Sequence, residues 1–129
     1  MVKEYEAKIE FSTDKELKAK DKIKIKTFSA ARVLNDCFPD DGIMVIQPAR
    51  ISLVNVHNER AKDDKDYSVI VIEAGEEMYR SSSTSLTESI NDIISALDED
   101  GESITENEIK FFKVKSKNNT GYILQATLN

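Results

Sequence analysis

The 129-residue chain has few of the residues on which most catalytic and metal sites depend. One cysteine, Cys37, and one histidine, His57, exclude an internal disulfide and a zinc site built from several Cys and His ligands. The four glycines stand singly, which excludes a glycine-rich phosphate-binding loop. The serine-rich run 81–85 has no histidine nearby in the sequence to activate a nucleophile. The aspartate clusters lack the spacing of a calcium-binding loop. We therefore expect no enzyme activity, no cofactor and no metal site.

Long apolar runs are also absent. No segment approaches the ~20 apolar residues of a membrane-spanning helix, and the N-terminal run MVKEYEAKIEF carries charges where a signal peptide would be apolar. With 40% hydrophobic and 33% charged residues, the chain has the composition of a folded globule. We expect a cytoplasmic protein with a single domain over residues 1–129 and no contact with a membrane.

The charges are distributed unevenly, although the formal net charge is only −6. Residues 18–32 contain six basic residues and one acid, and residues 110–129 contain four lysines and no acid. In contrast, residues 66–109 contain twelve acids and one arginine, a net charge of −11. The two basic segments can form one surface only if the fold brings them together. The fold therefore decides whether they can bind a polyanion jointly.

Alternation of polar and apolar residues predicts a strand at 5–11 and a second at 20–27, where lysines alternate with isoleucines. A long β-branched segment at 43–56 is interrupted by Pro48, which cannot donate a hydrogen bond to a sheet and predicts a bulge or an edge. Further strands are expected at 67–73, 78–81, 108–117 and 122–128.

The best helix signal follows the predicted strand at 78–81. Ser85 and Glu88 have the spacing of a capping box, and apolar residues recur on one face over residues 86–97. A shorter stretch, 29–36, predicts one or two further helical turns. We expect one amphipathic helix before the last two strands.

This order predicts a mainly β fold with one helix, a five-stranded barrel of the oligonucleotide-binding type with the helix between strands three and four. In that topology the first strand lies beside the fourth. With 20–27 as the first strand and 108–117 as the fourth, the two basic segments become neighbours across one sheet. The alternative is that these lysines only solvate an outward face or protect a sheet edge.

Three segments carry a resemblance to a known family. They are the run QPARISLVNV before a charged loop, the step EEMYRSSSTSLTESINDIISAL into the amphipathic helix, and the lysine-rich hairpin IKFFKVKSKNNTGYILQATL. Over residues 47–128 the chain resembles the small single-stranded DNA-binding proteins of tailed bacteriophages that replicate by protein priming, and similar phage proteins. The resemblance implies sequence-independent coating and protection of single-stranded DNA during phage genome replication.

Such a function needs a cationic groove for the backbone and exposed rings on which bases stack. The candidate DNA-binding residues are Lys22, Lys24, Lys26, Arg50, Tyr67, Tyr79, Phe111, Lys113, Lys115, Lys117 and Tyr122. Each of the four rings has an alternative role in the core, whereas Phe112 is expected in the core. Arg50 either lies at a sheet edge or contacts a phosphate. Arg80 lies among acids, so we expect it to form an internal salt bridge rather than a DNA contact.

The acidic segment 66–109 supports a different function. In this alternative, a small phage protein binds and inhibits a host defence protein and uses its acidic surface as a nucleic-acid mimic. A coating protein binds any oligonucleotide with a strong dependence on salt, whereas such an inhibitor ignores free DNA. Binding of RNA or of protein within a larger assembly is a third possibility. The expected partners are single-stranded DNA, further copies of the chain along the strand, and a phage or host replication protein.

Overall fold

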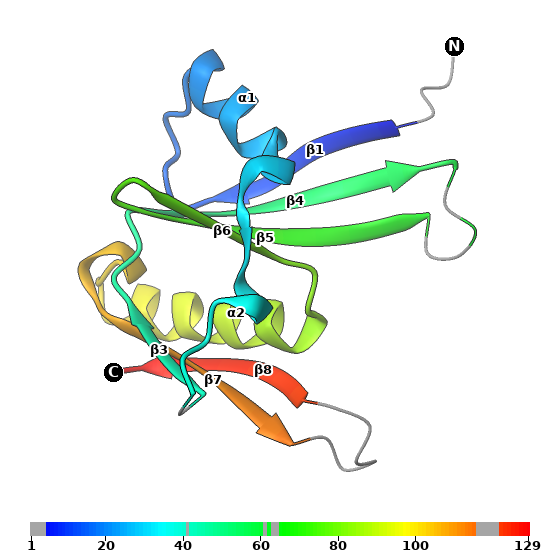
Figure 1. The fold of residues 1–129 in the computed structure, drawn as a ribbon. Coiled ribbons are helices and arrows are strands. Elements are labelled where there is room, and N and C mark those ends of the chain that lie inside the picture. Colours follow the sequence, from blue (N-terminus) through cyan, green and yellow to red (C-terminus); the bar gives the residue numbers. More distant parts are fainter. Residues whose placement is uncertain (1–4, 41, 61, 63–64, 116–121) are drawn as a thin grey trace.

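The computed structural model describes residues 5–40, 42–60, 62, 65–115 and 122–129 and has a mixed α/β fold. Within these residues, eight strands form two open sheets (Figure 1). The five-stranded sheet contains, in spatial order, β1 (Tyr5–Ser12), β4 (Arg50–Asn58), β5 (Asp66–Ala74), β6 (Glu77–Ser81) and β2 (Arg32–Val33). The three-stranded sheet contains β3 (Ile43–Ile46), β7 (Ile109–Lys115) and β8 (Tyr122–Leu128). The α-helices are α1 (Ala19–Lys26) and α2 (Thr84–Glu99).

The predicted interruption at Pro48 is confirmed, and it divides one long segment between two sheets. β3 pairs with β7 in the three-stranded sheet, whereas β4 pairs with β1 and β5 in the five-stranded sheet. Pro48 lies in the break and is buried. Because proline has no backbone N–H, it cannot continue a ladder, and the chain changes sheets at this point.

The predicted amphipathic helix is also confirmed, as α2. Its apolar face packs with both sheets in an inner core, and Leu86, Ile90 and Phe111 are fully buried there. The N-cap is Ser83 rather than the predicted Ser85, because the Ser83 hydroxyl accepts a hydrogen bond from the backbone N–H of Leu86 at 3.2 Å. Every residue in the run 81–85 has a hydroxyl that can cap a helix, so the end of β6 decides which one does.

The predicted closed barrel is not found among the described residues, and these residues form two α-helices rather than one. Three expected hairpin pairings are present, namely β4 with β5, β5 with β6, and β7 with β8, whereas β3 rather than residues 20–27 is the other neighbour of β7. A closing pair between β6 and β8 is not present in this part of the chain. Instead α2 packs along β8, and the Ser85 hydroxyl donates to the Leu124 carbonyl at 2.9 Å. The helix therefore occupies the place where a barrel would close.

The predicted strand at 20–27 is wrong, because this segment forms α1. Only Ile25 of its two isoleucines is buried, while Ile23 is 66% exposed. Ile25 packs with Phe28 and with the valines of β4 and β5 in an outer core, on the face of the five-stranded sheet opposite α2. A strand formed by residues 20–27 could not have paired with β4 or β7 at these positions, because β1 already pairs with β4 and β3 already pairs with β7. Lysine has a good helix propensity, so one anchoring isoleucine is sufficient for a helix.

The predicted turns at 29–36 form two 3-10 turns, Phe28–Ala30 and Leu34–Asp36, separated by the short strand β2. β2 pairs in parallel with β6 and places this segment along the edge of the five-stranded sheet. In the described residues, neither α-helix is long and apolar enough to cross a membrane.

Candidate nucleic-acid interface

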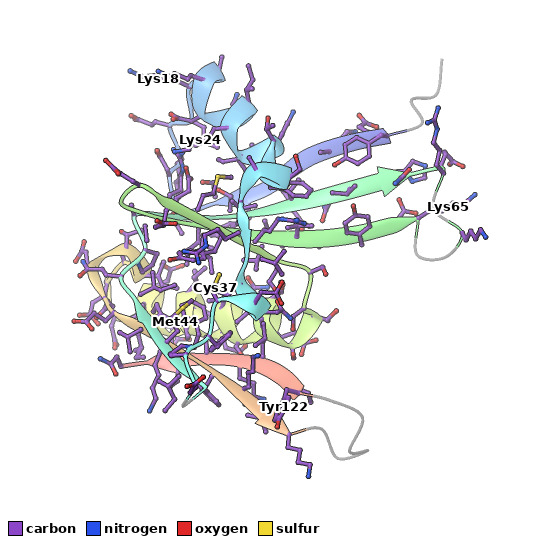
Figure 2. The ribbon with its side chains drawn as sticks, viewed as in Figure 1. Lys18, Lys24, Cys37, Met44, Lys65 and Tyr122 are labelled. Atoms are coloured by element: carbon purple, nitrogen blue, oxygen red, sulfur yellow. The ribbon has the colours of Figure 1, made fainter. Side chains whose placement is uncertain are left out.

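The two basic segments lie on different sides of the molecule. α1 covers the outer face of the five-stranded sheet, and β7 belongs to the other sheet (Figure 1). Figure 2 shows Lys18 and Lys24 at one end of the view and Tyr122 at the other. The single groove expected from neighbouring lysine strands therefore does not form. Lys22 and Lys26 are exposed on α1, and Lys24 makes an ion pair with Glu73 at 3.3 Å.

A basic surface does form on the hairpin of β7 and β8. Lys115 lies opposite Tyr122, and Lys113 lies opposite Leu124, so these side chains share one face. Tyr122 is 70% exposed. The strands β3, β7 and β8 carry three lysines and no aspartate or glutamate. We call Lys113, Lys115 and Tyr122 the basic hairpin surface. Lys117 lies outside the described residues.

The other face of the same hairpin is more apolar. Lys110 and Phe112, both half-buried, lie there with the exposed side chains of Ile43 and Val114.

On the basic hairpin surface, the Lys113 ammonium lies 5.1 Å from the centre of the Phe38 ring, a cation–π distance. Phe38 packs against the inner core, so this contact fixes Lys113 relative to the body of the protein.

Phe111 cannot present its ring to a base in this structure. It is fully buried between α2 and the two sheets, whereas its neighbour Phe112 is only half-buried. The sequence placed Phe111 on the same face as Lys113 and Lys115, which is correct. That face lies in the core at residues 109 and 111 and leaves it at residue 113, and alternation alone does not indicate where the core ends.

Arg50 contacts carboxylates rather than open solvent. Its guanidinium forms hydrogen bonds with Glu73, and its Nη1 atom lies 3.5 Å from both Asp14 and Asp21. The hydrogen bond with Glu73 raises the pKa of Arg50 above its ordinary value. A phosphate at Arg50 would have to compete with these three acids, so the arginine is committed to the internal network.

Tyr67 and Tyr79 are half-buried and lie on opposite faces of the five-stranded sheet. Tyr79 packs against the inner core, and Tyr67 packs at the margin of the outer core. Tyr67 borders three hollows of about 420, 560 and 250 Å³.

Arg80, expected in a salt bridge, has no carboxylate within 4 Å among the described residues. Its Nε atom donates to the Ala31 carbonyl at 3.2 Å.

His57 lies between two acids at the end of β4. Its Nδ1 is 2.6 Å from Asp66, and its Nε2 is 2.6 Å from Glu59. Hydrogen bonding with Asp66, and then with Glu59, raises the pKa of His57, and the same contact with His57 lowers the pKa of Glu59. Register places Asp66 opposite His57, a relationship that the sequence did not reveal. In the part of the chain that is described, no three or more His, Cys, Asp and Glu side chains gather as metal ligands would.

Comparison with known proteins adds no relative to this description. No family model matches the chain, and no curated protein and no solved structure matches it.

Proposed function

We propose that this protein binds single-stranded DNA without sequence preference, as a coating protein rather than an enzyme, through the basic hairpin surface. The observation that carries the proposal is the absence of acids from β3, β7 and β8 together with Tyr122, which is 70% exposed beside Lys115. Lysines that contact phosphates and a ring that stacks on any base give affinity without base readout.

The strand pairings are compatible with this function. It is supported by the order of β8, β7, the β3–β4 segment, β5 and β6, which agrees with the strand order of an oligonucleotide-binding barrel, although the two sheets are open and β1 is added beside β4. Such barrels contact nucleic acids through the face of their second and third strands and through two loops, one of which joins the last two strands. Here that loop lies outside the described residues, and the strands that carry it are β7 and β8. We therefore place the main DNA contact on the hairpin and not on α1.

The test is a titration with oligo(dT) followed by tyrosine fluorescence, since the chain has no tryptophan. Counterion release predicts that log affinity falls with log salt by about 0.7 for each phosphate contact. We expect Lys113→Glu/Lys115→Glu to weaken binding and to flatten this slope. Lys22→Glu/Lys26→Glu is the matched control, because it makes the same change in charge on α1, and it should leave the slope nearly unchanged.

Two results would contradict the proposal. Absence of any quenching or mobility shift with oligo(dT) at low salt would exclude DNA binding. Equal binding by the parent and the folded hairpin variant, with weaker binding by the α1 variant, would move the site to α1.

A second candidate function is supported by the exposed acids of α2. Glu88, Asp92 and Glu99 lie along one side of the helix, and no ion pair links them to a base in the described residues. Glu99 and Asp98 lie in the last turn, where the helix dipole disfavours acids. A protein that mimics nucleic acid for a host defence protein would use this side. It would ignore oligo(dT), and Glu88→Lys/Asp92→Lys would abolish its binding to the host protein.

A further inference from the structure

A hollow of about 250 Å³ opens on the outer face of the five-stranded sheet, between β5, β6 and the segment 28–35. Phe28 and Val69, both nearly fully buried, form its apolar side. Tyr67, Arg80 and Asn35 contribute a ring, a guanidinium and an amide to its walls. The hollow is smaller than the ~300 to 1,000 Å³ of a site for a drug-sized ligand, so it can enclose only part of a ligand of that size.

Arg80 places a cation at this hollow, and no carboxylate of the described residues forms an ion pair with it. The side chain is half-buried, and its one hydrogen bond within the described residues joins Nε to the Ala31 carbonyl. The two terminal nitrogens of the guanidinium remain able to donate, and no carboxylate of the described chain lies within 4 Å of them. Arginine binds phosphate through parallel N–H donors, so a phosphate would satisfy these nitrogens.

The aromatic part of the site extends beyond Tyr67. Tyr5 lies opposite Asn58 and Tyr67 lies opposite Val56, which places both tyrosines on the same face of the sheet. Tyr5 is 48% exposed. Burial raises the pKa of Tyr5, and the nearby Tyr67 raises it further. Tyr5 therefore lies near Tyr67 on this face, although it does not line the hollow that contains Arg80.

A second hollow, of about 560 Å³, extends from this region to the first turn of α2. It shares Tyr67 and Ser82 with the first hollow and reaches Thr84 and Thr87 on α2. The next residue of α2, Ser85, donates its hydroxyl to the carbonyl of Leu124 on β8. Tyr122 of the basic hairpin surface lies two residues before Leu124. The first turn of α2 therefore contacts β8 of the hairpin and also lines the hollow at Tyr67.

We propose that the hollow between Tyr67 and Arg80 binds one nucleotide of a single strand, with the base against the Tyr67 ring and a phosphate on the Arg80 guanidinium. The inference rests on the proposed function and adds to it a site away from the hairpin. It also assigns a role to the segment 28–36, which supplies Phe28 and Asn35 to the hollow.

The experiment uses thymidine 5′-monophosphate as the probe and isotope-labelled full-length protein observed by NMR. We expect saturable shifts of the backbone amide signals at 67–69 and 80–82, and weaker binding of thymidine and of inorganic phosphate, since each supplies only half of the contacts. Arg80→Gln should weaken nucleotide binding about tenfold, although glutamine can still donate to the Ala31 carbonyl. Tyr67→Leu should have a similar effect, because it removes the flat ring.

Arg32→Gln is the matched control. Arg32 lies on the neighbouring strand β2, is exposed and pairs with Glu77 at 3.6 Å, so its replacement removes the same charge close to the hollow. We expect its nucleotide affinity to stay within about twofold of the parent. An equal loss in Arg32→Gln would overturn the pocket, because the effect would then reflect general charge.

Three further outcomes would overturn the inference. These are unchanged signals at 67–69 and 80–82, equal binding of phosphate and nucleotide, and displaced signals of segment 28–36 in ligand-free Arg80→Gln. The last would assign Arg80 to structure alone. Oligo(dT) measured in parallel separates the two proposals. Binding of oligo(dT) with no nucleotide effect at Tyr67 leaves the coating function and removes the pocket, whereas the reverse result leaves a mononucleotide site and removes coating.

Discussion

Arg50 on β4 and Glu73 on β5 form a bidentate ion pair, and the two residues lie directly opposite each other in the sheet. The Arg50 Nη2 donates to one carboxylate oxygen at 2.9 Å, and its Nε donates to the other. The two side chains are 13% and 7% exposed. Lys24 on α1 also contacts Glu73, so the pair joins the helix to the sheet on the outer face.

We expect removal of one partner of this pair to destabilise the fold strongly. Glu73→Leu leaves the Arg50 charge without its main partner, and Arg50→Met leaves Glu73 with Lys24 alone. Breaking a buried pair typically costs about 3 to 5 kcal/mol of the free energy of unfolding, whereas replacing both partners costs much less. Urea denaturation of the two single variants and the double variant measures this difference. Additive losses in the double variant would show that the pair is not coupled.

The pH dependence of stability should report on His57. Its pKa is raised above the ordinary 6.5 by Asp66 and Glu59, so its stabilising effect is complete below the unfolded-state pKa and is lost as pH rises through the folded-state pKa. The lowered pKa of Glu59 has the opposite sense, because its contribution is lost as pH falls through the folded-state value.

The comparison is between the parent and His57→Gln. We expect the parent to have the higher melting temperature in weak acid and this advantage to shrink above neutral pH. The single imidazole signal in NMR gives the pKa directly. A difference in melting temperature that does not change with pH would show that the contact is not ionic.

The exposed ring of Tyr122 should contribute to DNA affinity without contributing to stability. Tyr122→Leu keeps an apolar side chain but loses the face on which a base stacks. We expect oligo(dT) affinity to fall about tenfold, or ~1.4 kcal/mol, with an unchanged salt slope because no phosphate contact is lost. Tyr122→Phe retains the ring and should bind like the parent. Unchanged affinity in Tyr122→Leu would show that the hairpin binds oligo(dT) by charge alone, without stacking on this ring.

Phe111 should behave in the opposite way. Because the ring is fully buried in the inner core, Phe111→Ala should lower the free energy of unfolding by about 3 to 5 kcal/mol. Phe112→Ala is the control, and its loss should be smaller because Phe112 is only half-buried. Chemical denaturation measures both. A larger loss at Phe112 would reverse the assignment of the two rings.

The start of α2 can be tested by single hydroxyl deletions. Ser83→Ala should cost about 1 kcal/mol of stability, because the Ser83 hydroxyl accepts from the Leu86 N–H. Ser82→Ala removes an exposed hydroxyl with no hydrogen bond among the described residues and should stay within about 0.5 kcal/mol of the parent. Thermal unfolding of both proteins measures the difference, and equal stability would remove Ser83 as the cap.

Features encoded within a few neighbouring residues could be predicted from the sequence. The spacing of apolar residues over 86–97 specifies α2, because a helix repeats every 3.6 residues whatever it packs against. Pro48 breaks the long strand because proline has no N–H. The terminal hairpin, with Lys113 and Lys115 on one face, follows from period-two alternation and a turn signal, whereas the register that adds Tyr122 to this face came from the structure.

The conformation of residues 19–26, the positions of the basic segments and the partners of Arg50 depend on long-range contacts, so only the tertiary structure determined them. The eight residues of α1 are too few for alternation to distinguish a strand from a helix, and no free strand position exists beside β7, because β3 lies there. The basic segments consequently lie apart. Arg50 is engaged by acids at positions 14, 21 and 73, and the hollow at Tyr67 combines residues from 28 to 82, so long-range packing alone brings these groups together.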